Sequence, residues 1–214
     1  PALNGPDWAK RGEAALSPAR YKVIAEKDVP VPMRDGVKLA ADVYRPDAPG
    51  RFPVIVLRTP YNKATPDEVQ NSRWYAERGY VVVNEDVRGR FASGGDFYTY
   101  RHEAQDGYDT DAWAAVQPWS SGKLGTLGGS YLGYTGLTQA IGGHPALKAV
   151  ATDVTTTDIY NSWVYSDGAF LLGFSLPWGA GTVYGRTTDG GGAFMKPEAY
   201  AKLPLNTADA ASYK

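Results

Sequence analysis

The sequence predicts an α/β fold, a mostly parallel sheet with helices on both faces. Apolar runs typical of buried strands alternate along the chain with segments of helical pattern, and this alternation is characteristic of such sheets. An extended hairpin precedes the alternation, so the predicted order is hairpin, then strand–helix–strand–helix–strand–helix–strand. The chain has 214 residues, of which 43% are hydrophobic and 21% charged, a composition that is ordinary for a globular chain with a sizeable core.

The predicted hairpin begins the ordered part of the chain. Two extended runs, residues 21–33 and 37–46, are separated by Arg34-Asp35-Gly36. Asp-Gly between two such runs is a strong hairpin signal, because both residues tolerate the backbone of a tight turn. The next run, residues 53–61, contains the continuous apolar stretch PVIVL, as expected of a strand that is covered on both faces.

A helix is predicted over residues 65–79. Thr65 suits the N-cap, Pro66 the first helical position and Gly79 the end of the helix. The remaining predicted elements are a buried strand over 80–86, a helix over 103–118, a short strand over 123–128, a helix over 131–143 and a strand over 147–153. Binding groups in parallel sheets gather at the carboxyl ends of the strands, so these ends are the expected place for a site.

Ser130 follows one of these strand ends, within the glycine-rich stretch GTLGGSYLGYTG of residues 125–136. A serine hydroxyl is a poor nucleophile until a base removes its proton, and a sharp strand–turn–helix holds it clear of the backbone for attack on a carbonyl. Gly128 and Gly129 leave room for such a turn. Leu132 stands where the generic G-x-S-x-G pattern has its second glycine, which here comes one position later.

The glycine-rich stretch has two interpretations. As a nucleophile turn, it places the N–H of Tyr131 among the unpaired N–H groups that begin a helix, where it can hold the oxyanion of a tetrahedral intermediate. As a packing motif, its glycines only let a helix approach the sheet, and Gly133 and Gly136 suit that role. A nucleotide-binding loop is excluded, because the spacing matches neither G-x-G-x-x-G nor G-x-x-x-x-G-K-[ST].

Composition and charge argue against several classes of function. Lys and Arg number 22 against 23 Asp and Glu, with no basic stripe, so nucleic acid is not an expected partner. No apolar run reaches about 18 residues, so no membrane span is expected. With no Cys and only 2 His, a metal site is not supported, and no cofactor is expected.

Several motifs together resemble a known family. They are MRDGVKLAADVYRP at 33–46, RTPYNK at 58–63, NEDVRGRFASGGDF at 84–97 and QPWSSGKLGTLGGSYLGYTGLTQA at 117–140. From about Val31 onward, the chain resembles the hydrolases grouped with cocaine esterase, α-amino-acid ester hydrolases and Xaa-Pro dipeptidyl-peptidases. The resemblance implies an α/β-hydrolase fold and an acyl-enzyme on Ser130. The family's own form of the serine turn is G-S-Y-x-G, which this sequence matches.

The resemblance implies a second donor to the oxyanion. In the family this donor is a tyrosine hydroxyl in the pattern R-x-P-Y, which makes Tyr61 the candidate here. A phenol can donate a hydrogen bond to a developing negative charge without ionising itself. From the residues alone, Tyr61 is better explained as an ordinary strand-end tyrosine that packs on a helix. In the loop after Asp86, we expect Arg88 to be a structural ion-pair donor.

Three segments are expected: an N-terminal arm over 1–20, the N-terminal part of the α/β-hydrolase domain over 21–153, and the start of a cap domain over 154–214. Residues 155–170, TTTDIYNSWVYSDGAF, are similar to the start of the family's helical cap. Trp163, Tyr165 and Phe170 are then expected to line an apolar acyl pocket, with the core of the cap as the alternative location for each ring.

The chain has no complete Ser–Asp/Glu–His triad in the chain order that this fold requires. His102 precedes Ser130, and His144 follows it with no carboxylate between them. Asp153 and Asp158 have no later histidine to orient. The resemblance implies that the acid and the base lie beyond the cap and are followed by a β-sandwich, on the same gene or on another chain.

The predicted function is a serine hydrolase that cleaves small carboxylic esters, with amides as an alternative, as part of a longer or multi-chain enzyme. An α-amino-acid ester hydrolase, an Xaa-Pro dipeptidyl-peptidase and a non-catalytic domain for binding or assembly stay open. Leu132 replaces the acidic residue often seen in the amino-ester branch, which favours a plain carboxylesterase. Homo-oligomers are compatible with this prediction. The start at Pro1 rather than Met favours a periplasmic or secreted location, with the cytoplasm as the alternative.

Overall fold

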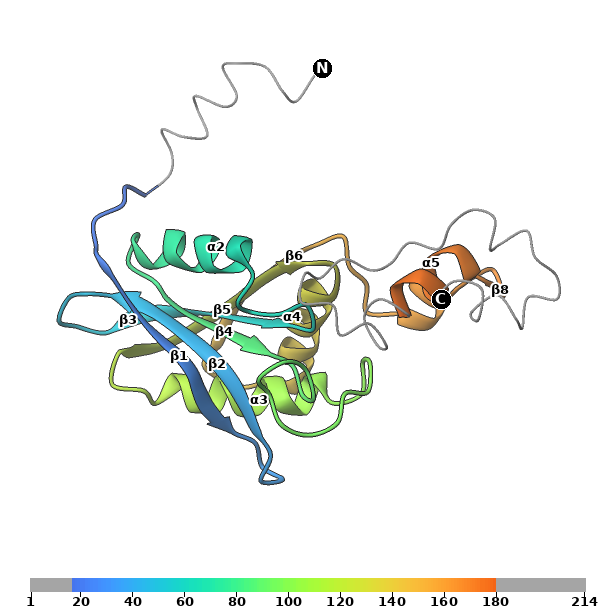
Figure 1. The fold of residues 1–214 in the computed structure, drawn as a ribbon, viewed down its shortest axis with the longest axis horizontal. Coiled ribbons are helices and arrows are strands. Elements are labelled where there is room, and N and C mark those ends of the chain that lie inside the picture. Colours follow the sequence, from blue (N-terminus) through green and yellow to red (C-terminus); the bar gives the residue numbers. More distant parts are fainter. Residues whose placement is uncertain (1–16, 180–214) are drawn as a thin grey trace, which may run out of the picture.

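The computed structural model describes residues 17–179, so the predicted arm up to residue 16 and the predicted cap beyond residue 179 lie outside the described part. Six strands form one sheet in the spatial order β1-β2-β4-β3-β5-β6 (Figure 1). They are β1 (Val23–Pro32), β2 (Lys38–Pro46), β3 (Phe52–Thr59), β4 (Val81–Asp86), β5 (Ser120–Gly129) and β6 (Leu147–Asp153). The β1–β2 and β2–β4 pairs are antiparallel, and the β3–β4, β3–β5 and β5–β6 pairs are parallel.

Helices cover both faces of the sheet. α2 (Pro66–Ala76) lies on one face, and α3 (Glu103–Ala115) and α4 (Ser130–Gly142) lie on the other (Figure 1). Each of these helices connects two strands that run in the same direction, as parallel neighbours require. The predicted order of hairpin followed by alternating strands and helices is confirmed.

The strands bury side chains in two cores, one on each face. The core on the α3 side includes Val31, Leu39, Val43, Val54, Val56, Val81, Val83 and Ala114, and the core on the α2 side consists of Tyr44, Ile55, Leu57, Ala76 and Val82. Successive residues of a strand point to opposite faces, so β3 and β4 supply both cores in turn. This two-sided burial explains their continuous apolar sequences.

Several local signals lie where the sequence predicts, although α2 ends at Ala76, before the predicted stop at Gly79. The β1–β2 turn is closed by a hydrogen bond from the Gly36 N–H to the Met33 carbonyl. Thr65 caps α2 by accepting a hydrogen bond from the Glu68 N–H at 3.4 Å. Gly143 follows α4 with a φ of +73°, a left-handed conformation that glycine adopts without a Cβ clash.

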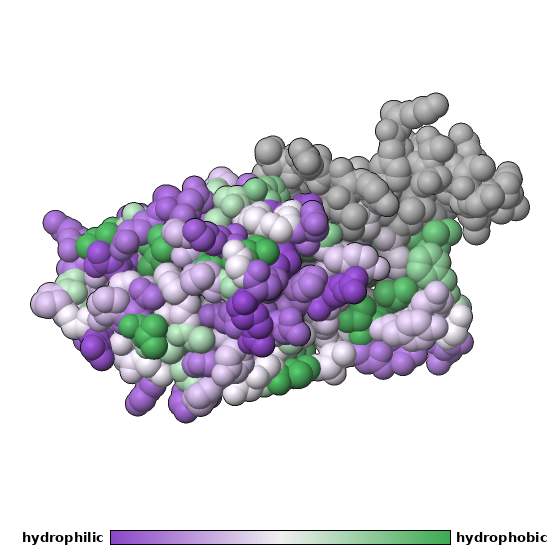
Figure 2. Space-filling model, turned by 90° about the horizontal axis from the view of Figure 1, so that it is seen from below, coloured by the Kyte–Doolittle hydropathy of each residue, from purple (hydrophilic) through white to green (hydrophobic). Residues whose placement is uncertain are grey.

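After β6 the chain continues beyond the carboxyl ends of the parallel strands (Figure 1). This segment contains a short π-helix (Tyr160–Val164), the hairpin of β7 (Tyr165–Ser166) and β8 (Ala169–Phe170), and α5 (Leu172–Gly179). Hydrophobic residues are visible at this end of the molecule in Figure 2, as they are elsewhere on the same face. The exposed large hydrophobic side chains that follow β6 include Val154, Tyr160, Phe170 and Phe174. Within residues 17–179, no helix has the length and apolar character needed to cross a membrane.

Two buried polar residues join α3 to α4. Asp111 and Gln139 are both 0% exposed, and Gln139 Nε2 donates to Asp111 Oδ1 at 3.0 Å. Among the described residues, Asp111 Oδ2 and Gln139 Oε1 have no hydrogen-bond partner. Burial raises the pKa of Asp111 to about 7, although the hydrogen bond from Gln139 and the charge of Arg58 act in the opposite direction. Burial therefore favours the protonated form of Asp111, although the contact with Gln139 by itself favours the carboxylate.

We expect Asp111→Asn to flatten the dependence of the unfolding free energy on pH. Between the ordinary pKa of 3.8 and the folded value of about 7, the folded chain holds a proton that the unfolded chain has released. The unfolding free energy of the parent therefore falls as the pH rises through this window, by at most about 1.4 kcal/mol per pH unit. Urea titrations between pH 4 and pH 8 measure this slope in both proteins.

Asp109→Asn, on the same helix, is the matched control with the opposite sign. Burial raises the pKa of Asp109, but hydrogen bonds from Arg34 outweigh this effect and lower it. The Asp109 carboxylate therefore stabilises the folded chain at neutral pH, and this stabilisation is lost as the pH falls through the folded pKa of Asp109. Asp109→Asn is expected to lower the unfolding free energy at neutral pH. If Asp111→Asn keeps the parental dependence of the unfolding free energy on pH, the raised pKa of Asp111 is contradicted.

Candidate active site

Ser130 lies at the carboxyl end of β5 and is the first residue of α4. Its φ is +56°, a left-handed conformation that is uncommon for a residue with a Cβ, and the residue is exposed. A strained, exposed serine between a strand and a helix has the geometry of a nucleophile turn. The turn presents its hydroxyl at the edge where the parallel strands end.

The glycines around the serine are required by close contacts. A Cβ on Gly128, whose φ is +155°, would lie 2.5 Å from the Cβ of Leu132. A Cβ on Gly129 would lie 2.7 Å from Asp153 Oδ1, and one on Gly133 would lie 2.9 Å from the carbonyl oxygen of Gly128. Gly133 therefore provides the close approach that the second glycine of the generic pattern provides, one residue later in the chain.

Tyr61 approaches Ser130 from the neighbouring strand. β3 and β5 pair in parallel, so the residues that follow their carboxyl ends come to the same edge of the sheet. The Tyr61 hydroxyl oxygen accepts a hydrogen bond from Trp178 Nε1 at 3.1 Å, and the Ser130 side chain lies close enough to act on it as a second hydrogen-bond donor. Burial raises the pKa of Tyr61, although these hydrogen bonds and the charge of Arg90 act against it. Tyr61 is therefore a neutral phenol with a proton to donate at neutral pH.

The loop that carries Tyr61 is held on both sides of this residue. Arg90 Nε donates to the carbonyl of Pro60 at 3.0 Å. The N–H of Lys63 donates to Asp86 Oδ1 at 2.9 Å, at the end of β4. These contacts limit the movement of the Tyr61 hydroxyl relative to the serine.

Tyr131 has a backbone group and a side chain in separate roles. Its N–H belongs to the first turn of α4, where N–H groups have no carbonyl partner within the helix. Its ring is 0% exposed, and its hydroxyl donates to Glu103 Oε1 at 2.7 Å and accepts from the Tyr100 N–H at 3.1 Å. The side chain therefore anchors the serine turn to α3, and the N–H is the candidate donor to an oxyanion.

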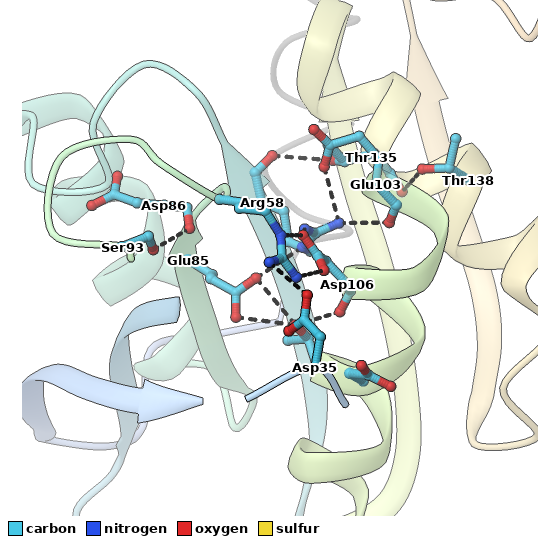
Figure 3. Close-up of polar contacts among 12 residues, drawn as sticks. Asp35, Arg58, Glu85, Asp86, Ser93, Glu103, Asp106, Thr135 and Thr138 are labelled. Atoms are coloured by element: carbon cyan, nitrogen blue, oxygen red, sulfur yellow. Dashed lines mark hydrogen bonds and ion pairs between the residues drawn. The ribbon is translucent and has the colours of Figure 1, made fainter. Parts of the chain in front are cut away.

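A buried ionic cluster includes Glu103, the residue that accepts from the Tyr131 hydroxyl (Figure 3). Arg58, at the end of β3, is 0% exposed and forms ion pairs with Glu85 at 2.8 Å and with Glu103 at 3.2 Å. Arg88 pairs with Asp106 at 2.6 Å, which confirms the prediction that Arg88 is a structural ion-pair donor. Because Glu103 also accepts from the hydroxyl that anchors the serine turn, the cluster connects β3, β4 and α3 to the site.

Aromatic rings line the same region. Tyr100 stacks on Tyr131 with a centroid distance of 5.0 Å and on Trp178 with one of 5.8 Å. Trp163, a predicted pocket residue, lies 6.1 Å from Tyr100, so the structure brings it to this group. Neither Tyr100 nor Trp178 carries a functional signal in the sequence, because a lone tyrosine in a loop and a tryptophan in an apolar run have many ordinary explanations.

The other two predicted pocket residues belong to a separate group. Tyr165 and Phe170 face each other across the β7–β8 hairpin with a centroid distance of 5.5 Å, and Tyr160 lies 4.5 Å from Tyr165. No ring contact within residues 17–179 joins these three to Tyr100 or Trp178. Residues directly opposite in a hairpin share one face, so the two rings pack against each other instead.

Neither a triad base nor a metal site emerges from the described part of the chain. His144 lies past the far end of α4, where it contacts the ring of Tyr108 at a centroid distance of 4.9 Å. The 13 residues of α4 separate it from the serine by about 20 Å. His102 precedes α3 and makes no side-chain capping bond. In residues 17–179, no group of three or more His, Cys, Asp or Glu is placed to hold a metal ion.

Comparison with known proteins gives one consistent result. Residues 35–213 match the family model described as X-Pro dipeptidyl-peptidase (S15 family). The cocaine esterase of Rhodococcus sp. (strain MB1 Bresler) is 41% identical over 169 residues, which are 75% of this chain and 29% of that protein. A CocE/NonD family hydrolase from Staphylococcus aureus superimposes with a TM-score of 0.69 at 31% identity, over 78% of this chain and 34% of that one. An α-amino acid ester hydrolase does so with a TM-score of 0.66 at 27% identity, over 87% of this chain and 34% of that one.

The chain spans about a third of the length of these relatives, between 29% and 34%. The likeness to the two solved hydrolases confirms the predicted α/β-hydrolase fold for the part of it that is present here. The family match runs from the turn of the first hairpin to residue 213 and includes every described element from β2 onward. The chain therefore belongs to the X-Pro dipeptidyl-peptidase (S15) family of hydrolases.

Proposed function

We propose that this chain is the N-terminal part of a serine esterase that forms an acyl-enzyme on Ser130. The observation that carries the proposal is the exposed Ser130 with a φ of +56°, beside the hydroxyl of Tyr61, which follows the adjacent parallel strand β3. The 41% identity to a protein named for its action on the ester cocaine supports esters as the substrate class.

The reaction divides between this chain and the rest of the enzyme. A base takes the proton of Ser130 Oγ while Oγ attacks the ester carbonyl, and negative charge develops on the carbonyl oxygen. The Tyr131 N–H and the Tyr61 O–H donate to this oxygen. Collapse of the intermediate expels the alcohol, which takes the proton from the base, and water then cleaves the acyl–serine bond in the same way. We assign the acid and the base to the part of the protein that the longer relatives contain.

We also assign residues 21–153 to the hydrolase domain and residues 154–214 to a cap over the serine. Contacts of the described part support this division, because Trp163 and Trp178 both reach rings beside the serine turn. An aromatic wall of this kind suits the acyl or alcohol group of a small uncharged ester. Leu132, at the position where the amino-ester branch often carries an acid, supports a plain carboxylesterase in the same way.

Labelling of the complete enzyme with a fluorophosphonate tests the proposal. We expect the probe to modify Ser130 and the modification to disappear in Ser130→Ala. Ser121→Ala is the matched control, because Ser121 is exposed at the end of β5 that lies away from Ser130. Labelling that survives in Ser130→Ala contradicts the proposed nucleophile. A complete enzyme that is not labelled contradicts the enzymatic function and favours a domain for binding or assembly. A comparison of benzoyl esters with α-amino-acid esters then tests the substrate class.

A further inference from the structure

A tryptophan from the segment after β6 contacts the candidate oxyanion donor. Trp178 Nε1 donates a hydrogen bond to the Tyr61 hydroxyl oxygen at 3.1 Å, across a sequence separation of 117 residues. Trp178 belongs to α5, whereas Tyr61 follows β3 in the sheet. The contact therefore links two parts of the chain that meet only in the folded protein.

The indole is held in one orientation by its neighbours. Its ring is stacked on Tyr100, with a centroid distance of 5.8 Å and an interplanar angle of 9°. It is also stacked near Tyr131, with a centroid distance of 6.0 Å and an angle of 18°. Stacking on both rings restricts rotation of the indole plane. The direction of its N–H toward Tyr61 is therefore fixed by packing as well as by the hydrogen bond.

The hydrogen-bond inventory of the two side chains gives this contact a direction. An indole N–H can only donate, so Tyr61 must be the acceptor in this bond. A phenol has one proton, which remains free to be donated to a different atom. The Ser130 side chain acts on Tyr61 in the same sense as Trp178, because it also lowers the pKa of Tyr61 and is therefore a donor to the phenol oxygen. With Trp178 on its acceptor side, the Tyr61 proton remains free for an acceptor that arrives beside the serine.

We infer that Trp178 is a positioning residue, which aims the Tyr61 proton at the oxygen that becomes negative when Ser130 attacks the substrate. The inference rests on the function proposed above. A donor on the phenol oxygen also polarises the O–H bond, because hydrogen bonds in a chain strengthen one another. Part of the oxyanion site is therefore assembled by the segment after β6, and not by the sheet alone.

The variant Trp178→Phe separates this role from simple packing. Phenylalanine keeps an aromatic ring for the stack but has no N–H. We expect kcat of the complete enzyme to fall about tenfold, the order expected for one lost hydrogen bond, with a change in KM below about twofold. Trp74→Phe on α2 is the matched control, because Trp74 contacts Arg78 and lies away from the serine turn, and we expect parental kinetics.

A double-mutant cycle with Tyr61→Phe shows whether Trp178 acts through Tyr61. If it does, Trp178→Phe causes no further loss of kcat once the Tyr61 hydroxyl is absent. The same tenfold loss in both backgrounds overturns the inference, and so does a raised KM with unchanged kcat, which is the result for a residue that only lines the pocket. A silent Tyr61→Phe overturns it together with the role of Tyr61, while fluorophosphonate labelling of Ser130 reports on the proposed nucleophile separately.

A titration gives a second measurement that does not depend on activity. The hydrogen bond from Trp178 lowers the pKa of Tyr61 against the larger effect of burial, so its removal should raise the pKa of Tyr61 further. NMR of the tyrosine ring carbons, with Tyr61→Phe to identify the signal, measures this in the parent and in Trp178→Phe. An unchanged titration midpoint overturns the inference.

Discussion

Replacement of Tyr61 by phenylalanine is expected to lower kcat of the complete enzyme by about a hundredfold or more, or about 3 kcal/mol, with little change in KM. The ring keeps its packing and only the hydroxyl is lost. A donor to an oxyanion acts mainly on the charge that develops in the transition state, so its loss appears in kcat and not in ground-state binding. Steady-state kinetics with a small aryl ester measure both constants.

Tyr98→Phe is the matched control for this experiment, because Tyr98 is 65% exposed and its hydroxyl can be removed at little cost. Tyr131→Phe does not serve as a control. It leaves the buried carboxylate of Glu103 and the N–H of Tyr100 without their shared partner, a change that costs about 1–3 kcal/mol of stability. A Tyr61→Phe enzyme with parental kcat contradicts the assigned oxyanion donor.

Replacement of Arg58 by methionine is expected to lower the unfolding free energy by about 3–5 kcal/mol. Methionine fills much of the same space but removes the guanidinium that pairs with Glu85 and Glu103. Both carboxylates then remain buried without their ion pair, because Arg58 and Glu85 are each 0% exposed. Chemical denaturation at neutral pH measures the loss.

Arg45→Met provides the comparison on the surface of the same sheet. Arg45 pairs with Glu26 at 2.9 Å, but their side chains are 30% and 48% exposed, so water replaces the lost contact. We expect this variant to change the unfolding free energy by less than about 1 kcal/mol. Equal costs for the two arginine variants contradict the view that the buried cluster holds β3, β4 and α3 together.

The element order and the serine turn could be predicted from the sequence because their signals are local. The apolar run of β3 indicates burial on both faces, and the Asp-Gly pair between β1 and β2 indicates a tight turn. The glycines around Ser130 indicate a turn that has no room for side chains at the neighbouring positions. A Cβ on Gly128 would indeed lie 2.5 Å from the Cβ of Leu132. The ends of the helices do not follow from local signals alone: the helix predicted over 103–118 ends at Ala115.

The sequence by itself therefore determined the fold class, the order of its elements and the position of the strained serine. Only the tertiary structure decided which side chains meet at that serine. Trp178 reaches Tyr61 over 117 residues, and the hydroxyl of Tyr131 reaches Glu103 over 28. The physical reason is that periodicity and turn chemistry act over a few neighbouring residues, whereas these contacts depend on how α5 and α3 pack around the carboxyl ends of the strands.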